Sequence, residues 1–306
     1  MSVYDVSGDS LSVLYGESGT SVNVAYDIDG NLVFNGDPVP IPVDYDDYTL
    51  SSLYNISITH CQGLAISNNV LFQFGTSGSS SEDKVCLFDF ISGSDITRDM
   101  TIESDHGDSA TFSKEYYASG DEFPLLYVTA DTTPAIIYVN RVTRTTSTLI
   151  RTLVFPQSAG YYGAGAFDWD NNVCYLLAYK QNNYQTDGGG SNTTVVSKWD
   201  LSNLTDNGDG TYTPAFISQY ERPFIYVMQG LAYHDGYTWI SSGYGGNTSY
   251  IYAMNPSTGV IGHTITLGIR EVEGLDFVFD STSQTYYMVI GEQNGYYKKC
   301  TFAPIT

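Results

Sequence analysis

Polar side chains that could bind a ligand or exchange protons recur along this chain, each time close to a small residue and an apolar segment. They are His60, Gln62, His106, Asp108, Tyr161, Gln229, Glu271 and Glu273. If the apolar segments converge in the fold, these side chains surround one axial mouth. A concavity with a few convergent polar groups is the usual form of a ligand-binding site. A structural role is the alternative, in which the same groups hydrogen-bond with one another and with water.

The acids of the chain raise a second possibility, which is hydrolysis of a glycosidic bond. The candidates for the required pair of carboxyl groups are Asp108, Glu271, Glu273 and Asp276. The chain contains no GxSxG, HExxH or GxxxxGK motif, and these are the patterns that mark several common catalytic or phosphate-binding sites. The sequence therefore favours a protein without catalytic activity or cofactor, with a glycan-active hydrolase as the alternative.

Two groups of residues are of the types that bind metals. The first group is His60, His106 and Asp108. The two histidines are 46 residues apart, which is not a metal-site spacing. Residues 206–212 resemble the start of an EF-hand calcium loop, but Ile217 occupies the twelfth position, where that loop requires glutamate. We predict no metal site, and a tight hairpin turn at residues 206–212.

A repeated phrase predicts the fold that would position these side chains. Its small residues are Gly63, Ser109, Ala164, Gly230 and Gly274, with steps of 46, 55, 66 and 44 residues. A repeat of about 40–50 residues with several strands in each unit is typical of radial β-arrays. The sequence therefore predicts an all-β fold, a five-bladed β-propeller, with the phrase as the inner strand of each blade. The small residues would leave room where the inner strands converge.

The final repeat contains one strand fewer than the others. The segment Ser51–Ile58 precedes the first repeat and could supply the missing strand, which would close the ring and remove two open sheet edges. A β-sandwich with a second domain is the alternative, but it would leave the fivefold phrase unexplained.

Residues 1–47 differ from the rest of the chain. Two strand-and-turn phrases, Tyr4–Gly8 and Tyr26–Asn31, are followed by the proline-rich segment Asp37–Pro42, which favours an extended backbone. We predict an attachment or oligomerisation arm at residues 1–47 and the propeller at residues 48–306.

The composition excludes some classes of partner. With 34 acids against 12 bases, the chain has a net charge of −22 and would repel nucleic-acid phosphates. No apolar run of about 18 residues is present to insert into a membrane, and the N-terminus lacks the basic and apolar regions of a secretory signal. Cys61, Cys86, Cys174 and Cys300 have no metal-site spacing and are predicted to be buried free thiols.

Several aromatic residues lie in or near Gly/Asn/Ser-rich segments. Rigid amphipathic rings in such positions suit recognition of sugars or proteins. They include Tyr161, Tyr162, Tyr233, Tyr237, Trp239, Tyr296 and Tyr297.

Three segments resemble tail-associated proteins of gut-bacterial phages and prophages. They are Tyr26–Asn31, His106–Phe112 and Phe123–Val128, which match a YD-[IV]-x-GN strand before a propeller, an H-x-[DN]-[SA]-x-x-F opening and an FPLLY[VI] strand. The resemblance implies a homo-oligomeric virion protein of the tail fibre or tail tip. Its arm would bind other tail proteins, and its propeller would bind a host-surface glycan or a neighbouring tail protein, or serve only as a structural part. Release by lysis would agree with the missing secretory signal. The resemblance implies no catalytic residue.

Overall fold

The computed structural model describes short strands within residues 3–34, and then residues 40–56, 58, 61–75, 83–107, 109–130, 132–181, 193–223, 227–243, 248–269 and 271–305. Two of the predicted site residues, His60 and Asp108, lie outside the described residues. Apart from one 3₁₀ turn, η1 (Gln157–Ala159), all the regular secondary structure described is β-strand. The prediction of an all-β fold is therefore confirmed.

Three sheets contain four strands each, and all their neighbours are antiparallel. The first holds β8 (Leu64–Ser67), β9 (Val70–Phe74), β10 (Lys84–Asp89) and β11 (Asp95–Thr101). The second holds β20 (Met228–His234), β21 (Tyr237–Ser242), β22 (Thr248–Met254) and β23 (Ile261–Ile269). The third holds β24 (Val272–Asp280), β25 (Thr285–Glu292) and β26 (Tyr296–Pro304), with β7 (Val43–Asn55) paired to β26.

An eight-stranded sheet joins two further groups of four strands. One group is β12 (Ser109–Phe112), β13 (Leu126–Ala130), β14 (Ile136–Val142) and β15 (Ser147–Val154), and the other is β16 (Tyr161–Asp168), β17 (Val173–Tyr179), β18 (Thr193–Asp206) and β19 (Thr211–Pro223). The groups meet only where β15 and β19 run parallel, through the pairs Thr152↔Thr211 and Leu153↔Tyr212. All other pairs in this sheet are antiparallel.

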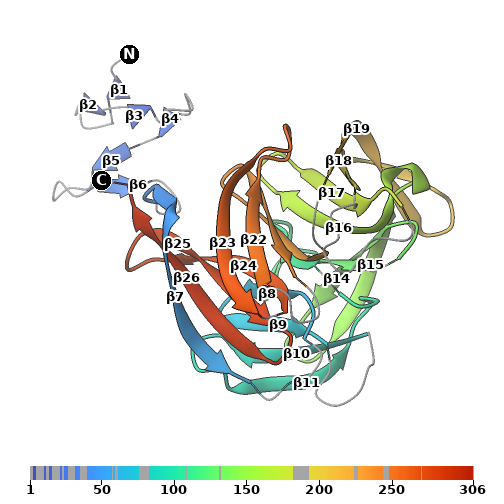
Figure 1. Cartoon of the computed structure of the whole chain (residues 1–306), viewed down its shortest axis with the longest axis horizontal. Helices are drawn as coiled ribbons and strands as arrows, with labels where there is room; N and C mark the ends of the chain where they lie inside the picture. The colour runs from blue at the N-terminus through green and yellow to red at the C-terminus, as the bar shows by residue number, and fades with distance from the viewer. Residues whose placement is uncertain are drawn as a thin grey trace.

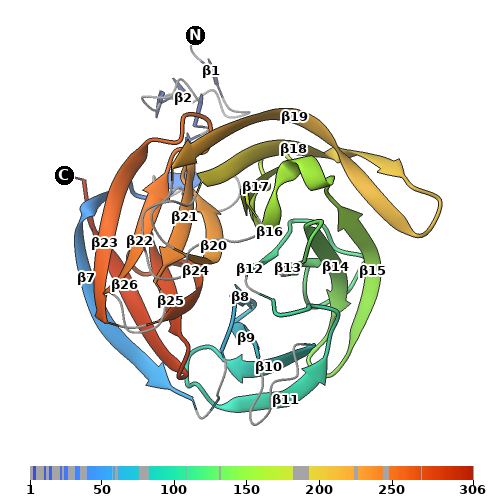
Figure 2. The same ribbon diagram turned by 45° about the vertical axis from the view of Figure 1, so that its right-hand side comes forward.

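The sheets are arranged around a common centre (Figure 2). The strands β8, β12, β16, β20 and β24 lie together at that centre and contact one another, whereas β7, β11, β15 and β23 lie at the rim. This radial arrangement is that of a β-propeller. It places the start of each repeated phrase at one end of the central strands.

The core lies between the faces of neighbouring sheets. Every side chain of β9 and of β17 is buried, as expected for strands covered on both faces. Aromatic rings fill the space between two sheets, where Phe72 of β9 lies 5.1 Å from both Phe112 and Phe123 between ring centroids. Such edge-to-face contacts add to the free energy gained by burying the rings.

Six short strands precede the propeller. They form three two-stranded sheets, β1 (Val3–Tyr4) with β2 (Ser10–Leu11), β3 (Leu14–Tyr15) with β4 (Ser21–Val22), and β5 (Val24–Tyr26) with β6 (Leu32–Phe34). Each is a hairpin of consecutive strands, and Figure 1 shows these strands beside the end of the propeller where β7 begins. The described strands of this region pair only with one another.

The apolar segments Lys84–Asp89 and Ser147–Val154, which the sequence predicts to be strands, are β10 and β15 with the same bounds. The predicted strand Ser51–Ile58 differs, because the observed strand β7 ends at Asn55 and begins at Val43. It therefore crosses the predicted boundary between residues 47 and 48. The reason is its composition, since the edge strand is mostly exposed and lacks the apolar pattern that revealed the other strands.

The predicted hairpin turn at residues 206–212 is confirmed. It joins β18 to β19, and its two glycines have left-handed φ values of 82° and 86°, at Gly208 and Gly210. Asp206 accepts a hydrogen bond from the Gly208 N–H, and Asp209 accepts one from Thr211. Within the described part of the chain, no helix is long and apolar enough to span a membrane.

One buried polar side chain connects the first sheet to the last. The Gln73 side chain is fully buried in β9, and its Nε2 donates to the carbonyl oxygens of Gln62, Gly63 and Phe74 at 2.8–3.1 Å. Its Oε1 accepts a hydrogen bond from the hydroxyl of Tyr297 in β26. Because a buried amide is costly unless its donors and acceptors are paired, this contact ties the two sheets together.

Removing that hydroxyl provides a test. We expect Tyr297→Phe to lower the free energy of unfolding by about 1–3 kcal/mol, because Gln73 Oε1 loses its partner in a buried site. Tyr296→Phe is the matched control, since Tyr296 is 45% exposed and its hydroxyl should contribute less than about 0.5 kcal/mol. Chemical denaturation of both variants measures the difference. Equal stability of the two would show that the buried hydrogen bond does not stabilise the fold.

The pairing of β7 with β26 leads to a second test. Tyr45 of β7 is 6% exposed and lies 4.9 Å from the rings of both Trp239 and Phe302. Deleting residues 1–39 should leave the melting temperature unchanged, whereas deleting residues 1–55 should lower it by about 10 °C or more, because β26 and this aromatic cluster lose a partner. Differential scanning calorimetry distinguishes the two truncations. An equal effect of both would contradict this role for β7.

Candidate functional site

At the centre of the propeller, the strand backbones approach one another closely. A Cβ on Gly230 would meet the carbonyl oxygen of Glu273 well inside contact distance, and a Cβ on Gly274 would lie 2.7 Å from the backbone nitrogen of Leu64. For these two glycines, the predicted packing role is confirmed. A larger residue at either position would push neighbouring strands apart.

Ser109 has a role that the sequence did not reveal. Its side chain is buried, and its Oγ lies 3.0 Å from the Gly165 carbonyl oxygen and 2.9 Å from that of Leu231. These acceptors belong to β16 and β20, so one hydroxyl hydrogen is shared between two other central strands. The repeat indicated only a small residue at this position. A serine in place of glycine or alanine was the available signal for a polar contact.

Three of the predicted mouth residues lie together at the ends of β20 and β24. Gln229 Nε2 donates to Glu271 Oε1 at 3.1 Å, and Glu271 is hydrogen-bonded to Glu273. Burial raises the pKa of Glu271, while its hydrogen bonds to Glu273 and Gln229 lower it. The mouth therefore contains two neighbouring glutamates and an amide, joined by hydrogen bonds of Glu271.

The remaining predicted mouth residues are arranged differently. Gln62 uses its backbone, donating its N–H to the Phe74 carbonyl oxygen at 2.9 Å and accepting from Gln73. His106 is half-buried with a left-handed φ of 79°, and Tyr161 is half-buried at the start of β16. The Gly107 carbonyl oxygen accepts from the Gly63 N–H at 2.9 Å, so the backbone at His106 is held against the first central strand.

Asp276 lies apart from the glutamate pair. Its Oδ2 accepts from the backbone N–H of Ile66 in β8 at 2.8 Å, and its Oδ1 accepts from its neighbour Phe277 at 2.8 Å. Burial raises the pKa of Asp276 to about 7, against the lowering effect of these two donors. The carboxyl group thus joins the first and last central strands.

This geometry differs from that of a glycosidase. A hydrolytic pair needs carboxyl groups about 5 Å apart or more, so that the glycosidic bond or a water molecule fits between them. Glu271 and Glu273 contact each other directly, and Asp276 is directed at β8. Glu271 and Glu273 therefore leave no such gap between their own carboxyl groups. Within the described residues, no cluster of three histidine, cysteine or acidic side chains could hold a metal ion.

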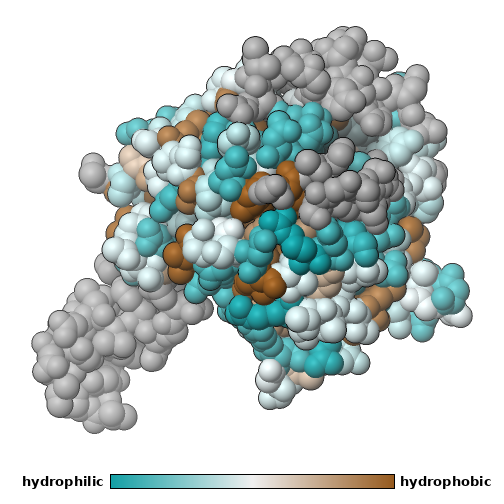
Figure 3. All heavy atoms as spheres, turned by 90° about the horizontal axis from the view of Figure 1, so that it is seen from below, coloured by the Kyte–Doolittle hydropathy of each residue, from teal (hydrophilic) through white to brown (hydrophobic). Residues whose placement is uncertain are grey.

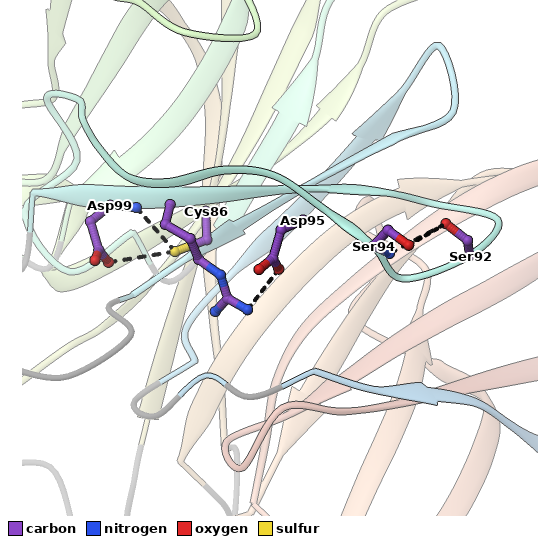
Figure 4. Close-up of polar contacts among 6 residues, drawn as sticks. Cys86, Ser92, Ser94, Asp95 and Asp99 are labelled. Carbon is purple, nitrogen blue, oxygen red and sulfur yellow. Dashed lines mark hydrogen bonds and ion pairs between the residues drawn. The ribbon is translucent and has the colours of Figure 1, made fainter.

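The cysteines are buried free thiols, as predicted. Cys86 lies opposite a bulge in β11, where Asp99 has a φ of 51° (Figure 4). The Asp99 N–H donates to Cys86 Sγ at 3.4 Å, and the thiol contacts the Asp99 carboxylate at 3.6 Å. Burial raises the pKa of Cys86 to about 11, so the thiol stays protonated at neutral pH and is a poor nucleophile.

The aromatic residues only partly fit the predicted recognition role. Trp239 is fully buried and Tyr297 is 1% exposed, so for these two the prediction was wrong. Both belong to the core between sheets, and their flanking Gly/Asn/Ser residues misled the prediction. Tyr296 is 45% exposed. On the face seen in Figure 3, the hydrophobic residues form small separate patches among hydrophilic ones.

No protein-family model and no curated protein matches this sequence. Among solved structures, Kuenenia stuttgartiensis hydrazine synthase is 12% identical with a TM-score of 0.38, covering 78% of this chain and 57% of that chain. A putative oxidoreductase (glucose dehydrogenase) of Thermus thermophilus is 10% identical with a TM-score of 0.43, covering 83% of this chain and 100% of that chain. The WD40 domain of Toxoplasma gondii coronin is 9% identical with a TM-score of 0.42, covering 88% of this chain and 90% of that chain. At these scores, the similarities carry no argument about function.

The position of Asp276 leads to a test by pH. Because its pKa is raised from 3.8 to about 7, its contribution to stability is complete below pH 4 and is lost as the pH rises through 7. We expect the unfolding free energy of the wild type, relative to Asp276→Asn, to fall by on the order of 1–2 kcal/mol between pH 4 and pH 8, a value reduced for partial exposure. Urea titrations at several pH values measure this. A difference that is constant with pH, or that rises, would contradict the assignment.

Proposed function

We propose that this chain is a five-bladed β-propeller carried on the tail fibre or tail tip of a phage virion, where it binds a host-surface glycan or a neighbouring tail protein without chemical turnover. Residues preceding β7 would attach it, as a homo-oligomer, to other tail proteins. The assignment to a phage tail rests on the segment resemblance at Tyr26–Asn31, His106–Phe112 and Phe123–Val128.

The blade count is supported by the way the eight-stranded sheet divides. Its two halves are antiparallel groups of four consecutive strands, and they share only two residue pairs, at the parallel contact between β15 and β19. Counted as two blades, they join the three four-stranded sheets to give five. The five repeated phrases then correspond to β8, β12, β16, β20 and β24.

Closure by an N-terminal strand is supported by the pairing of β7 with β26. The register runs from Tyr296↔Asn55 to Pro304↔Val43, and β7 is the outer strand of a sheet otherwise built from the last three strands. This pairing leaves the six preceding short strands outside the ring, where they are available for attachment.

Recognition without turnover is supported by one observation, which is that Glu271 and Glu273 contact each other directly. Gln229 also donates a hydrogen bond to Glu271. The polar groups of the mouth are committed to one another rather than spaced around a bond to be cleaved. A preformed polar cluster of this kind suits hydrogen bonding to a ligand. The mouth residues Gln62, His106, Tyr161, Gln229, Glu271 and Glu273 are the first candidate surface, together with His60 and Asp108.

A glycan array and a reducing-sugar assay on the same preparation test this proposal. We expect the wild type to bind glycans and to release no reducing ends from them, and Glu273→Gln to leave that absence of turnover unchanged. Glu221→Gln is the matched control, since Glu221 pairs with Lys180 on the exposed part of β19. Turnover by the wild type that Glu273→Gln abolishes and Glu221→Gln preserves would favour the hydrolase instead. A wild type that binds no glycan would contradict the glycan part of the proposal.

A further inference from the structure

One connection on the propeller is much longer than its equivalents. Between the first and second strands of each four-strand unit, the chain uses residues 68–69, 169–172, 235–236 and 281–284 in four units, but residues 113–125 between β12 and β13. This long loop lies at the end of the central strands opposite the mouth, because it follows the first strand rather than preceding it. Insertions of this kind in repeat folds are frequent binding surfaces.

The long loop presents two tyrosines to solvent. Tyr116 is 49% exposed and Tyr117 is 54% exposed. Together with residues 118–121, they line a surface depression of about 470 Å³. A Cβ on Gly120 would meet nothing within 4 Å, so space above the loop is open. The depression therefore combines two aromatic rings, of Tyr116 and Tyr117, with the backbone peptide groups of residues 118–121.

The loop is fixed in place by contacts on its inner side. Phe123 and Leu125 are each 1% exposed and anchor its end in the core. The Asp121 carboxylate accepts two bonds from Arg141 of β14, at 3.1 Å and 2.5 Å, and one from the Ala118 N–H at 3.0 Å. The Arg141 guanidinium also lies 5.2 Å from the centre of the Tyr117 ring. A loop held in this way loses little conformational entropy when it binds a ligand.

The charges around the loop favour an uncharged ligand. Its neighbouring cations are already paired with acids, Arg141 with Asp121, Arg144 with Glu122 and Lys114 with Asp170. The chain as a whole has a net charge of −22, which repels anions. Only six residues line the depression, far fewer than the roughly 20–30 residues that each partner contributes to a standard protein interface.

We propose that Tyr116 and Tyr117 form a binding site for a neutral pyranose sugar. A pyranose has an apolar C–H face that can pack on a tyrosine ring and hydroxyl groups that can bond to the peptide groups at residues 118–120. This inference rests on the glycan recognition proposed above, and it adds to the mouth residues a second candidate surface, on the opposite face of the propeller. An apolar ligand would need a more enclosed cavity.

Binding to an array of neutral and of sialylated or phosphorylated oligosaccharides tests the inference, with affinities then measured for the best-bound neutral oligosaccharide. We expect Tyr116→Ala and Tyr117→Ala each to weaken binding by about tenfold or more, and Tyr117→Phe to retain it. Phe216→Ala is the matched control, since Phe216 is an exposed aromatic residue elsewhere, at 56%, and its loss should leave the affinity unchanged. In the unaltered protein, the oligosaccharide should protect Tyr116 and Tyr117 from nitration by tetranitromethane.

Other outcomes overturn the inference in distinguishable ways. If the tyrosine variants bind as the wild type does while Gln229→Ala loses binding, the glycan site is at the mouth, and the proposed function stands without this loop. If only anionic oligosaccharides bind, the ligand class is wrong. If the wild type binds no oligosaccharide, both this inference and the glycan part of the proposed function fail.

Discussion

The approach of strand backbones at the centre of the propeller is the constraint on which the rest of the structure depends. Gly230 lies against the Glu273 carbonyl, and Gly274 lies against the backbone of Gly63 and Leu64. Where no side chain fits, polar backbone groups must still be paired. Ser109 meets part of that requirement by directing one hydroxyl at carbonyl groups of two other central strands.

That constraint separates the roles of the acidic residues. Asp276 lies within the central layer and binds backbone N–H groups of its own strand and of β8. Glu271 and Glu273 lie at the end of the strand, where they bind each other and Gln229. Acidic residues of one strand thus have two roles. Asp276 bonds to the backbone of a neighbouring strand, and Glu271 and Glu273 form part of the polar mouth. The two roles go with position along β24, since Glu271 and Glu273 lie at its start and Asp276 lies within it.

The few basic residues are concentrated where they order a loop. Of the 12 Lys and Arg residues in the chain, three pair with acids of the segment between β12 and β13, namely Arg141, Arg144 and Arg151. In an acidic protein, such pairs offset local repulsion between carboxylates, although each exposed pair contributes little free energy on its own. Their effect is to fix a loop whose tyrosines face the solvent. The long insertion is therefore an ordered surface.

Local patterns in the amino-acid sequence were enough to predict the strands, the repeat and the small residues at the centre. Alternation of apolar segments with turns is a local property, and it located strands such as β10 and β15 with their observed bounds. The predicted strand Ser51–Ile58 covered only the last part of β7, because an exposed edge strand has no apolar pattern and its partner β26 lies at the other end of the chain. Local patterns could not show that Trp239 and Tyr297 are buried, or that Gln73 meets Tyr297. Those facts depend on which sheets face one another. Contacts between residues distant in sequence leave no local signal, so the packing of the sheets had to be known from the folded chain.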